Sequence, residues 1–177
     1  LNTQERHIWP GLFTSKIDNT AKSWPVAEIT NQIALSRTRS GSGGQIHFSM
    51  IALTENRRGL SEALRTQSYA TPALVPSSPW LDMQPPSAPV VQVDGATGRP
   101  SVRYTVRSKA KEPVRIFAVS AHYGDRWQVT LAPVREDGTA SIEIASAVPE
   151  GSLNRVAVQA IDRAGNASPI TWAPLGN

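Results

Sequence analysis

The sequence predicts a chain of two parts, an α/β segment followed by an all-β antiparallel sandwich. The first half alternates short apolar runs with segments of helical periodicity, whereas the second half repeats short runs rich in Val, Ile and aromatic residues, separated by turn residues. Between Tyr69 and Pro89, six prolines remove backbone donors and favour an extended connector. We therefore expect one domain over residues 1–85, connector included, and a second over residues 86–177.

Four elements are predicted in the first half, in the order strand, helix, strand, helix. Residues 8–13 form an apolar run that indicates a buried strand. Ser23 is a suitable N-cap for a helix whose apolar spacing continues to about Arg39. The run 46–53 indicates a second buried strand, and its residues 46–51 are apolar on both faces, as expected for parallel strands. The spacing after it predicts a second helix ending near Ser68.

Two such βα units leave both edges of a parallel sheet unpaired, so they do not form a stable sheet alone. A closed barrel of this kind needs eight units, about 250 residues. The sequence therefore predicts that residues 1–85 are the C-terminal βαβα remnant of a TIM (β/α)8 barrel; a small α+β layer packed against the sandwich is the alternative. Because the sequence begins at Leu1 instead of Met, we expect the remainder of the barrel in a missing N-terminal part or in a second chain.

Seven short runs predict a seven-stranded antiparallel β-sandwich in the second half. Turn pairs such as Asp137-Gly138 and Gly165-Asn166 separate them. Because cysteines are absent, the pattern fits a fibronectin type III-like sandwich better than a disulfide-bonded immunoglobulin domain. The predicted strands span residues 90–94, 102–106, 114–120, 127–132, 140–144, 156–161 and 170–172. The aromatic residues at strand positions that fit the core are Tyr104, Phe117, Tyr123, Trp127 and Trp172.

Several separated blocks of the first half agree in order and spacing with a known family. They are Gly11-Leu12, a helix with Trp24, Glu28-Ile29 and Gln32-Ile33, then Gly43-Gly44, Phe48-Ser49 and the segment Pro72-Ala73-Leu74-Val75-Pro76. Over about residues 6–82, the chain resembles the C-terminal part of bacterial glycosyl hydrolase-like 10 family proteins. The ending VAVQAIDRAGNASP at residues 156–169 resembles the fibronectin type III-like domains that often follow them.

The resemblance implies a parent glycoside hydrolase that acts on an envelope or extracellular polysaccharide, for example the glycan strands of peptidoglycan. It also implies a bacterial protein that is periplasmic, lipoprotein-anchored or secreted. Glycoside hydrolysis normally uses two carboxylates. In residues 1–85 only Asp18 and Glu55 fall in loops after strands, where barrel active sites lie, and each is better explained as a solvated loop charge. The catalytic residues therefore stay unassigned, and we expect this chain alone to be inactive.

The fragment could instead contribute part of the wall of a substrate cleft. Phe13 and Ser15 end the first strand and Ser49 ends the second, so these side chains belong to the edge where such sites form. Trp24 could stack on a sugar ring or pack as a hydrophobic cap on its helix. His47 could point into the cleft or serve as a hydrogen-bonded structural histidine. The predicted substrate-binding residues are thus Phe13, Ser15, Trp24, His47 and Ser49.

Composition argues against several other functions. The 177 residues include no cysteine, which rules out disulfides, thiolate metal sites and cysteine nucleophiles. The formal net charge of +4 is shared evenly between the halves, and the basic residues are scattered, so we expect no nucleic-acid partner. No apolar run approaches the length of a membrane span. The spacing of His, Asp and Glu suggests no metal site, no phosphate loop is present, and we expect no cofactor.

A second hypothesis is a non-catalytic carbohydrate- or protein-binding adhesion module, in which the sandwich binds the partner. A row of exposed aromatic residues would favour that hypothesis. Because the aromatic residues of the sandwich fit core positions, the sequence instead favours a sandwich that acts as a spacer and support.

Overall fold

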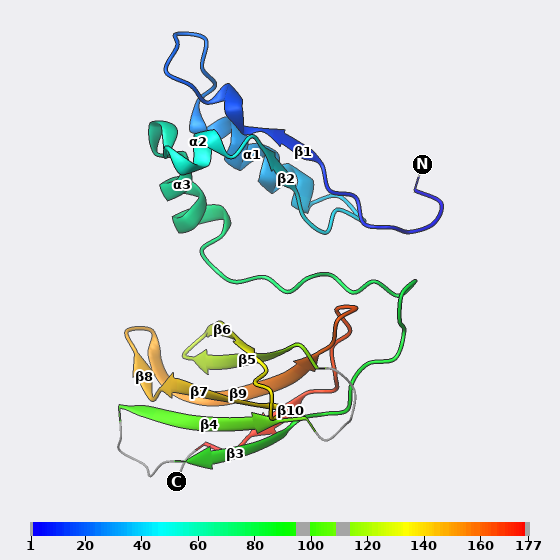
Figure 1. Cartoon of the computed structure of the whole chain (residues 1–177). Coiled ribbons are helices and arrows are strands. Elements are labelled where there is room, and N and C mark those ends of the chain that lie inside the picture. Colours follow the sequence, from blue (N-terminus) through cyan, green and yellow to red (C-terminus); the bar gives the residue numbers. More distant parts are fainter. Residues whose placement is uncertain (1, 95–99, 109–113, 176–177) are drawn as a thin grey trace. The chain divides into compact units, whose positions relative to one another are not determined.

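The computed structural model describes residues 2–94, 100–108 and 114–175 and divides into two compact units, Leu1–Ala73 and Leu74–Asn177. The elements of the first unit follow one another as coloured in Figure 1. They are β1 (Gly11–Phe13), η1 (Thr14–Lys16), α1 (Val26–Arg37), β2 (Ile46–Phe48), α2 (Ile51–Thr54), η2 (Arg57–Gly59), α3 (Leu60–Ala63) and the π-helical turn η3 (Leu64–Ser68). No helix among the described residues combines the length and the apolarity needed to cross a membrane.

The core of the first unit lies between its two strands and its helices. β1 and β2 are parallel, with Leu12 opposite His47 and Phe13 opposite Phe48. Leu12 is buried, whereas Phe13 is half-exposed, as expected for successive residues on opposite faces of a strand. The buried apolar side chains that pack together are Leu12, Ile17, Ile29, Ile33, Ala52, Leu60 and Leu64.

The N-cap of helix α1 lies two residues after Ser23, the N-cap that the sequence predicts. Its N-cap is Pro25, and Val26 is its first residue. The Ser23 hydroxyl accepts a hydrogen bond from the Asp18 backbone N–H at 3.0 Å, so it closes the preceding loop instead of capping the helix. Ile29 and Ile33, one turn apart, are both buried and bring the helix onto the core.

The predicted fold class, a TIM-barrel remnant followed by a seven-stranded sandwich, is wrong. β1 and β2 have three residues each, and among the described residues they pair only with each other, so the parallel sheet stops at two strands. The predicted strand 46–53 ends at Phe48 and becomes helical at Ile51. Most of the regular structure is β, in antiparallel sheets of the second unit. Short apolar runs do not distinguish a strand from a buried helical turn, which explains the error in the first half.

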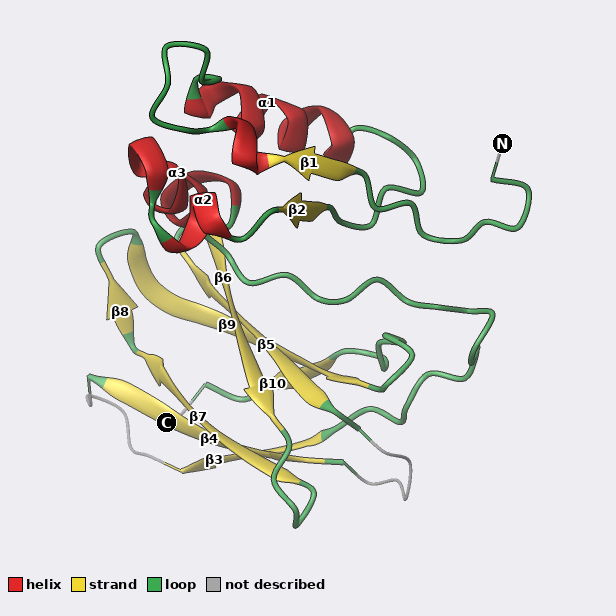
Figure 2. Ribbon diagram, turned by 45° about the horizontal axis from the view of Figure 1, so that its top comes forward, coloured by secondary structure: helices red, strands yellow, loops and turns green. Residues whose placement is uncertain are grey.

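The second unit consists of two antiparallel sheets around one core. Its strands are β3 (Val90–Asp94), β4 (Ser101–Arg107), β5 (Ile116–Tyr123), β6 (Arg126–Pro133), β7 (Thr139–Ala145), β8 (Ala147–Val148), β9 (Gly151–Ile161) and β10 (Thr171–Ala173). One sheet has the order β10-β9-β5-β6, with β8 also paired to β9, and the other has the order β3-β4-β7 (Figure 2). The predicted number of seven strands is wrong, because the two-residue strand β8 is too short to give a sequence pattern.

The connector that follows residue 73 belongs to the second unit, not to the first. Ser78 N–H donates to the Ala164 carbonyl at 2.7 Å, and the Asn166 side-chain amide donates to the Asp82 carbonyl at 3.2 Å. The turn that these bonds engage contains Gly165, at φ +82°, directly against the connector backbone. The division at 73/74 therefore falls before the expected one at 85/86, since the prolines extend the connector without detaching it.

Gly165→Ala is expected to destabilise the second unit by about 2–4 kcal/mol. A Cβ at this position would lie 2.8 Å from the Pro76 carbonyl oxygen, and a non-glycine residue at this φ costs roughly 1–2 kcal/mol by itself. Gly138→Ala is the matched control, because Gly138 has φ +78° and nothing within 4 Å of an added Cβ. Urea denaturation of the full chain measures the free energy of unfolding of both variants. Equal decreases for the two would show that the connector backbone does not restrict the space at Gly165.

Two buried tyrosines of the sandwich core differ in the environment of their hydroxyl groups. Tyr123 donates a hydrogen bond to the Ala145 carbonyl at 2.7 Å. The hydroxyl oxygen of Tyr104 is buried and has no hydrogen-bond partner among the described residues. Burial raises the pKa of both phenols, and for Tyr104 the nearby Tyr123 raises the pKa further. A buried polar group without a partner costs free energy, so the Tyr104 hydroxyl opposes folding while its ring supports it.

Tyr104→Phe is expected to raise the free energy of unfolding by about 0.5–1 kcal/mol, because it removes an unpaired buried hydroxyl and keeps the ring. Tyr123→Phe is expected to lower the free energy of unfolding by about 1–2 kcal/mol, because it breaks a hydrogen bond and leaves the Ala145 carbonyl unpaired. Chemical denaturation at neutral pH compares the two variants. If Tyr104→Phe lowers the free energy of unfolding as much as Tyr123→Phe does, the Tyr104 hydroxyl is not unpaired in the folded protein.

Candidate functional site

Three aromatic side chains gather at the carboxyl ends of β1 and β2. The rings of Phe13 and Phe48 stack at a centroid distance of 5.0 Å with an interplanar angle of 17°. Trp24 meets Phe13 edge to face, at 6.2 Å and 75°. Phe13 and Phe48 remain 45% and 47% exposed. We call Phe13, Trp24 and Phe48 the aromatic cluster; it presents aromatic rings to solvent at the edge where parallel strands end.

Next to the aromatic cluster, two side-chain hydroxyl groups donate hydrogen bonds to backbone carbonyls and so join the ends of the two strands. The Ser15 hydroxyl donates to the Phe48 carbonyl at 3.4 Å, and the buried Thr14 hydroxyl donates to the Ser49 carbonyl at 3.1 Å. The peptide bond between Phe48 and Ser49 is cis. The predicted residues Ser15 and Ser49 therefore lie beside the cluster, and Ser49 is itself exposed.

His47 lies apart from the aromatic cluster. Because it is the register partner of Leu12, its side chain leaves the sheet on the face opposite to Phe48. Its Nε2 is 2.7 Å from the Tyr69 hydroxyl, which also accepts a hydrogen bond from the Gln45 amide at 2.5 Å. The Tyr69 hydroxyl donates to Nε2 in one tautomer of the neutral imidazole and accepts from Nε2–H in the other. His47 is thus held by Tyr69 within the unit and does not share a surface with the other predicted residues.

The environment of His47 favours its neutral form. Burial lowers the pKa of the imidazole below its ordinary value. Its Nδ1 is buried and has no hydrogen-bond partner among the described residues. Protonation would charge this partly buried ring and give it an Nδ1–H without an acceptor among the described residues, whereas an Nε2–H would still donate to the Tyr69 hydroxyl.

Asp18 and Glu55, the two carboxylates that follow the strand ends in the sequence, interact with residues of their own loops. Asp18 accepts hydrogen bonds from the backbone N–H and the hydroxyl of Thr20, at 2.8 and 2.6 Å, and these bonds lower the pKa of Asp18. Glu55 forms an ion pair with Arg57 at 2.7 Å. For Asp18, the hydrogen bonds from Thr20 disfavour the protonated carboxylic acid that a glycosidic general acid requires.

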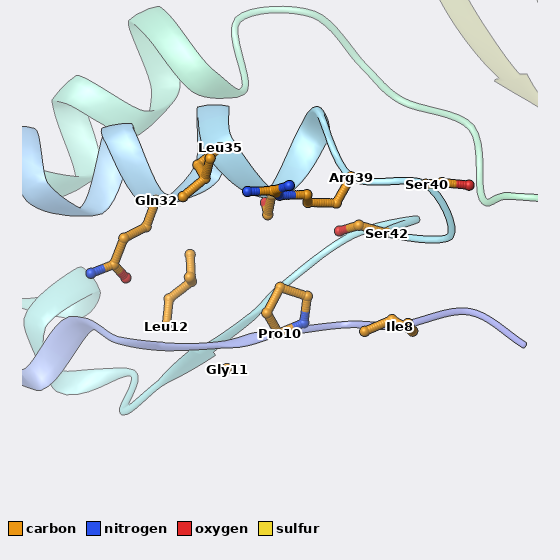
Figure 3. Close-up of a pocket in the computed structure, with 10 residues that line it drawn as sticks. Ile8, Pro10, Gly11, Leu12, Gln32, Leu35, Arg39, Ser40 and Ser42 are labelled. Carbon is orange, nitrogen blue, oxygen red and sulfur yellow. The ribbon is translucent and has the colours of Figure 1, made fainter. Parts of the chain in front are cut away.

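A pocket of about 380 Å³ lies on the other side of β1, between this strand and the C-terminal end of α1. Figure 3 shows Pro10, directly before β1, and Leu12 on β1 facing Leu35 and Arg39 across the pocket. Its lining is mainly apolar, with Arg39 as the only charged side chain. None of the predicted substrate-binding residues lines this pocket, and it contains no carboxylate, so it is separate from the candidate site.

The described residues contain no group of three or more His, Asp or Glu side chains placed to hold a metal ion. Of the five predicted contact residues, Phe13, Ser15, Trp24 and Ser49 lie together and His47 does not. Phe48 completes the cluster and was not predicted as a contact residue. The signal in the sequence that could have identified Phe48 is its position. Phe48 follows Ile46 by two residues in the second strand, as Phe13 follows Gly11 by two residues in the first.

Comparison with known proteins finds a sequence relative among the glycosyl hydrolases. No protein-family model matches the chain. Over 85 residues, 47% of this chain, it is 38% identical to the glycosyl hydrolase YngK of Bacillus subtilis (strain 168), and the match covers 17% of that relative. The chain therefore spans less than a fifth of the relative's length, and its similarity is to part of a glycosyl hydrolase.

Among solved structures, the chain resembles the Spr0440 glycoside hydrolase domain, Endo-D, from Streptococcus pneumoniae R6. The sequence identity is 19% and the TM-score 0.38, over 52% of this chain and 15% of the other. At this TM-score the likeness carries no argument about fold. The glycosyl hydrolase-like 10 family and the fibronectin type III identity of the second unit gain no support from these comparisons and stay predictions.

Acidification is expected to destabilise the first unit through His47. Because the folded state lowers the pKa of His47, its contribution to stability is present above the ordinary histidine pKa and is lost as the pH falls through the folded value. Urea denaturation of the wild type between about pH 7.5 and pH 5 should therefore show a falling free energy of unfolding. His47→Gln should reduce this pH dependence; an unchanged slope in that variant would contradict the role of His47.

Proposed function

We propose that this chain is a sugar-contacting part of a glycoside hydrolase protein, with the aromatic cluster as its contact surface and without catalytic carboxylates of its own. The observation that carries the proposal is the half-exposed, stacked pair Phe13 and Phe48 beside Trp24. The 38% identity to a glycosyl hydrolase over 85 residues supports the choice of sugar as the ligand.

The chemistry of a pyranose ring suits such a surface. Its C–H groups are polarised by neighbouring oxygens and carry partial positive charge, whereas the face of an aromatic ring is negative. A sugar that lies on the exposed ring faces also removes apolar surface of Phe13 and Phe48 from water. The exposed hydroxyl-bearing residue Ser49 lies at the rim of the cluster, where sugar hydroxyl groups would be accessible.

The proposal assigns no bond cleavage to this chain. Hydrolysis of a glycosidic bond normally requires a protonated acid and a second carboxylate a few ångströms away. The hydrogen bonds from Thr20 favour the ionised form of Asp18, and Glu55 is occupied by Arg57. We therefore propose that catalytic carboxylates, if the whole protein hydrolyses glycans, are supplied by residues outside this chain. An envelope or extracellular polysaccharide is the proposed substrate of that protein, with a periplasmic, lipoprotein-anchored or secreted location.

Replacing both phenylalanines, Phe13→Ala with Phe48→Ala, is expected to weaken oligosaccharide binding by about tenfold or more, because stacking and apolar burial are lost together. Isothermal titration of the full chain with chitohexaose and cellohexaose measures the affinity. A reducing-end assay on the same mixtures is expected to detect no cleavage by the wild-type chain.

Leu35→Ala is the matched control, since Leu35 is an exposed apolar residue of the same unit outside the cluster. Phe48→Tyr keeps the ring and should retain most of the affinity. Unchanged thermal unfolding of the double variant separates lost contact from lost structure. The proposal fails if neither hexasaccharide binds the wild type, or if the double variant binds as tightly as the Leu35→Ala control.

A further inference from the structure

Two tryptophans of the second unit are exposed, contrary to their predicted place in the core. Trp127 on β6 and Trp172 on β10 are 45% and 56% exposed, and their ring centroids are 6.4 Å apart at an interplanar angle of 49°. The prediction of a core position failed because strand alternation permits either face, and the core face of this sheet is filled by Phe117 and Tyr123, among others.

The register of the sheet explains how tryptophans on its two outermost strands come together. Trp172 lies opposite Ala157 on β9, and Ala157 lies opposite Ser120 on β5. These small side chains lie between the tryptophans on the outer face, so the indoles can lean inward over them and approach each other. The result is an aromatic surface on a pleated sheet instead of two isolated rings.

A histidine extends this surface and is held in place. His122 lies opposite Trp127, and their rings are 4.5 Å apart at 43°. His122 Nδ1 is 2.7 Å from the Asn154 side-chain oxygen. We call Trp127, Trp172 and His122 the tryptophan platform. Because a ring held by its neighbours loses little freedom when a ligand binds, such a platform is preorganised.

The charge beside the platform is positive. Arg155 is the other register partner of His122, and with Asn154 and Trp172 it lines a pocket of about 340 Å³. Arg155 forms no ion pair with any residue that the structure describes. The nearby acidic residues Asp125 and Glu150 belong to turns, not to the strand positions beside the platform. An anionic group next to an aromatic ring is therefore complementary to this surface.

We propose that the tryptophan platform binds an acidic glycan, with pyranose rings on the two indoles and a sugar carboxylate on Arg155. The proposal rests on the proposed function for the choice of sugar as the ligand, but it assigns a second site on a different unit. Two indole faces offer stacking to successive sugar rings, and one guanidinium pairs with one carboxylate in a bidentate geometry. This site also restores the binding role that the sequence disfavoured for the second unit.

Two other ligands with flat or apolar faces fit less well. Single-stranded nucleic acid also stacks on tryptophan, but its binding needs a groove with many cations along the phosphate backbone. Here Arg155 is the one permanent cation that lines the pocket beside the platform. A proline-rich peptide docks in an aromatic groove through apolar contact and needs no cation. The glycan accounts for both the indoles and Arg155.

The test uses the ¹⁵N-labelled full chain with hexagalacturonate as the acidic glycan and cellohexaose as its neutral counterpart. Hexagalacturonate should bind more tightly than cellohexaose and shift the indole N–H signals of Trp127 and Trp172 in NMR spectra. Trp127→Ala and Trp172→Ala should each weaken its binding by about tenfold. Arg155→Gln should bring its affinity down to that of cellohexaose and remove the salt dependence of binding.

Trp9→Ala is the matched control, because Trp9 is 48% exposed and belongs to the first unit; it should leave hexagalacturonate binding unchanged. Equal binding by the wild type and by both platform variants overturns the proposal. So does selective binding of decaproline or an oligothymidylate in place of the glycan.

A chain with Phe13→Ala and Phe48→Ala distinguishes this proposal from the first one. If it loses chitohexaose binding and retains the hexagalacturonate shifts at the platform, both proposals hold. If the wild type binds no neutral hexasaccharide at the aromatic cluster but hexagalacturonate still shifts the platform signals, only the first proposal fails. Chitohexaose binding that depends on Phe13, with no response of Trp127 or Trp172 to hexagalacturonate, overturns only the platform.

Discussion

The in-register parallel pairing of β1 with β2 is the constraint on which the first unit depends. Because successive side chains leave a strand on opposite faces, one register places Phe13 beside Phe48 and, on the other face, Leu12 beside His47. The first pair forms the exposed cluster, and the second faces the helices and Tyr69. Gly11 permits this arrangement, since a Cβ there would lie 3.2 Å from the Phe48 ring. A slip by one residue would exchange the two faces.

The same alternation organises the second unit, where β5 supplies both the core and the platform. Its Phe117, Val119, Ala121 and Tyr123 fill the space between the sheets, whereas His122 faces outward beside Trp127. The core is not optimised for stability alone, because one fully buried tyrosine has no partner for its hydroxyl among the described residues. Both units thus separate a packed apolar face from an exposed aromatic one, and both exposed faces are suited to flat ligands with apolar surfaces.

The sequence predicted which of several candidate residues lie near one another and misjudged how others lie. Phe13 and Ser49 were expected at the strand ends and Trp24 at the start of the following helix, and these three lie at or beside the aromatic cluster because strand ends follow from short apolar runs. His47 was expected among them as well, and the register directs it to Tyr69 instead. The fold class was wrong, since two βα units predict neighbouring strands that the described sheet does not have. The exposure of Trp127 and Trp172 could not be predicted, because an aromatic residue in a strand suits either face.

The amino-acid sequence by itself determined the absence of thiol chemistry, the even distribution of charge, the turns at Gly138 and Gly165, and the apolar segments that form both cores. These properties depend on composition and on local backbone preference, which are readable one segment at a time. The tertiary structure decided which rings meet, which face of each sheet is exposed, and that the connector packs on the turn at Gly165. Those outcomes depend on register and on contacts between residues far apart in the chain, and no local pattern encodes them.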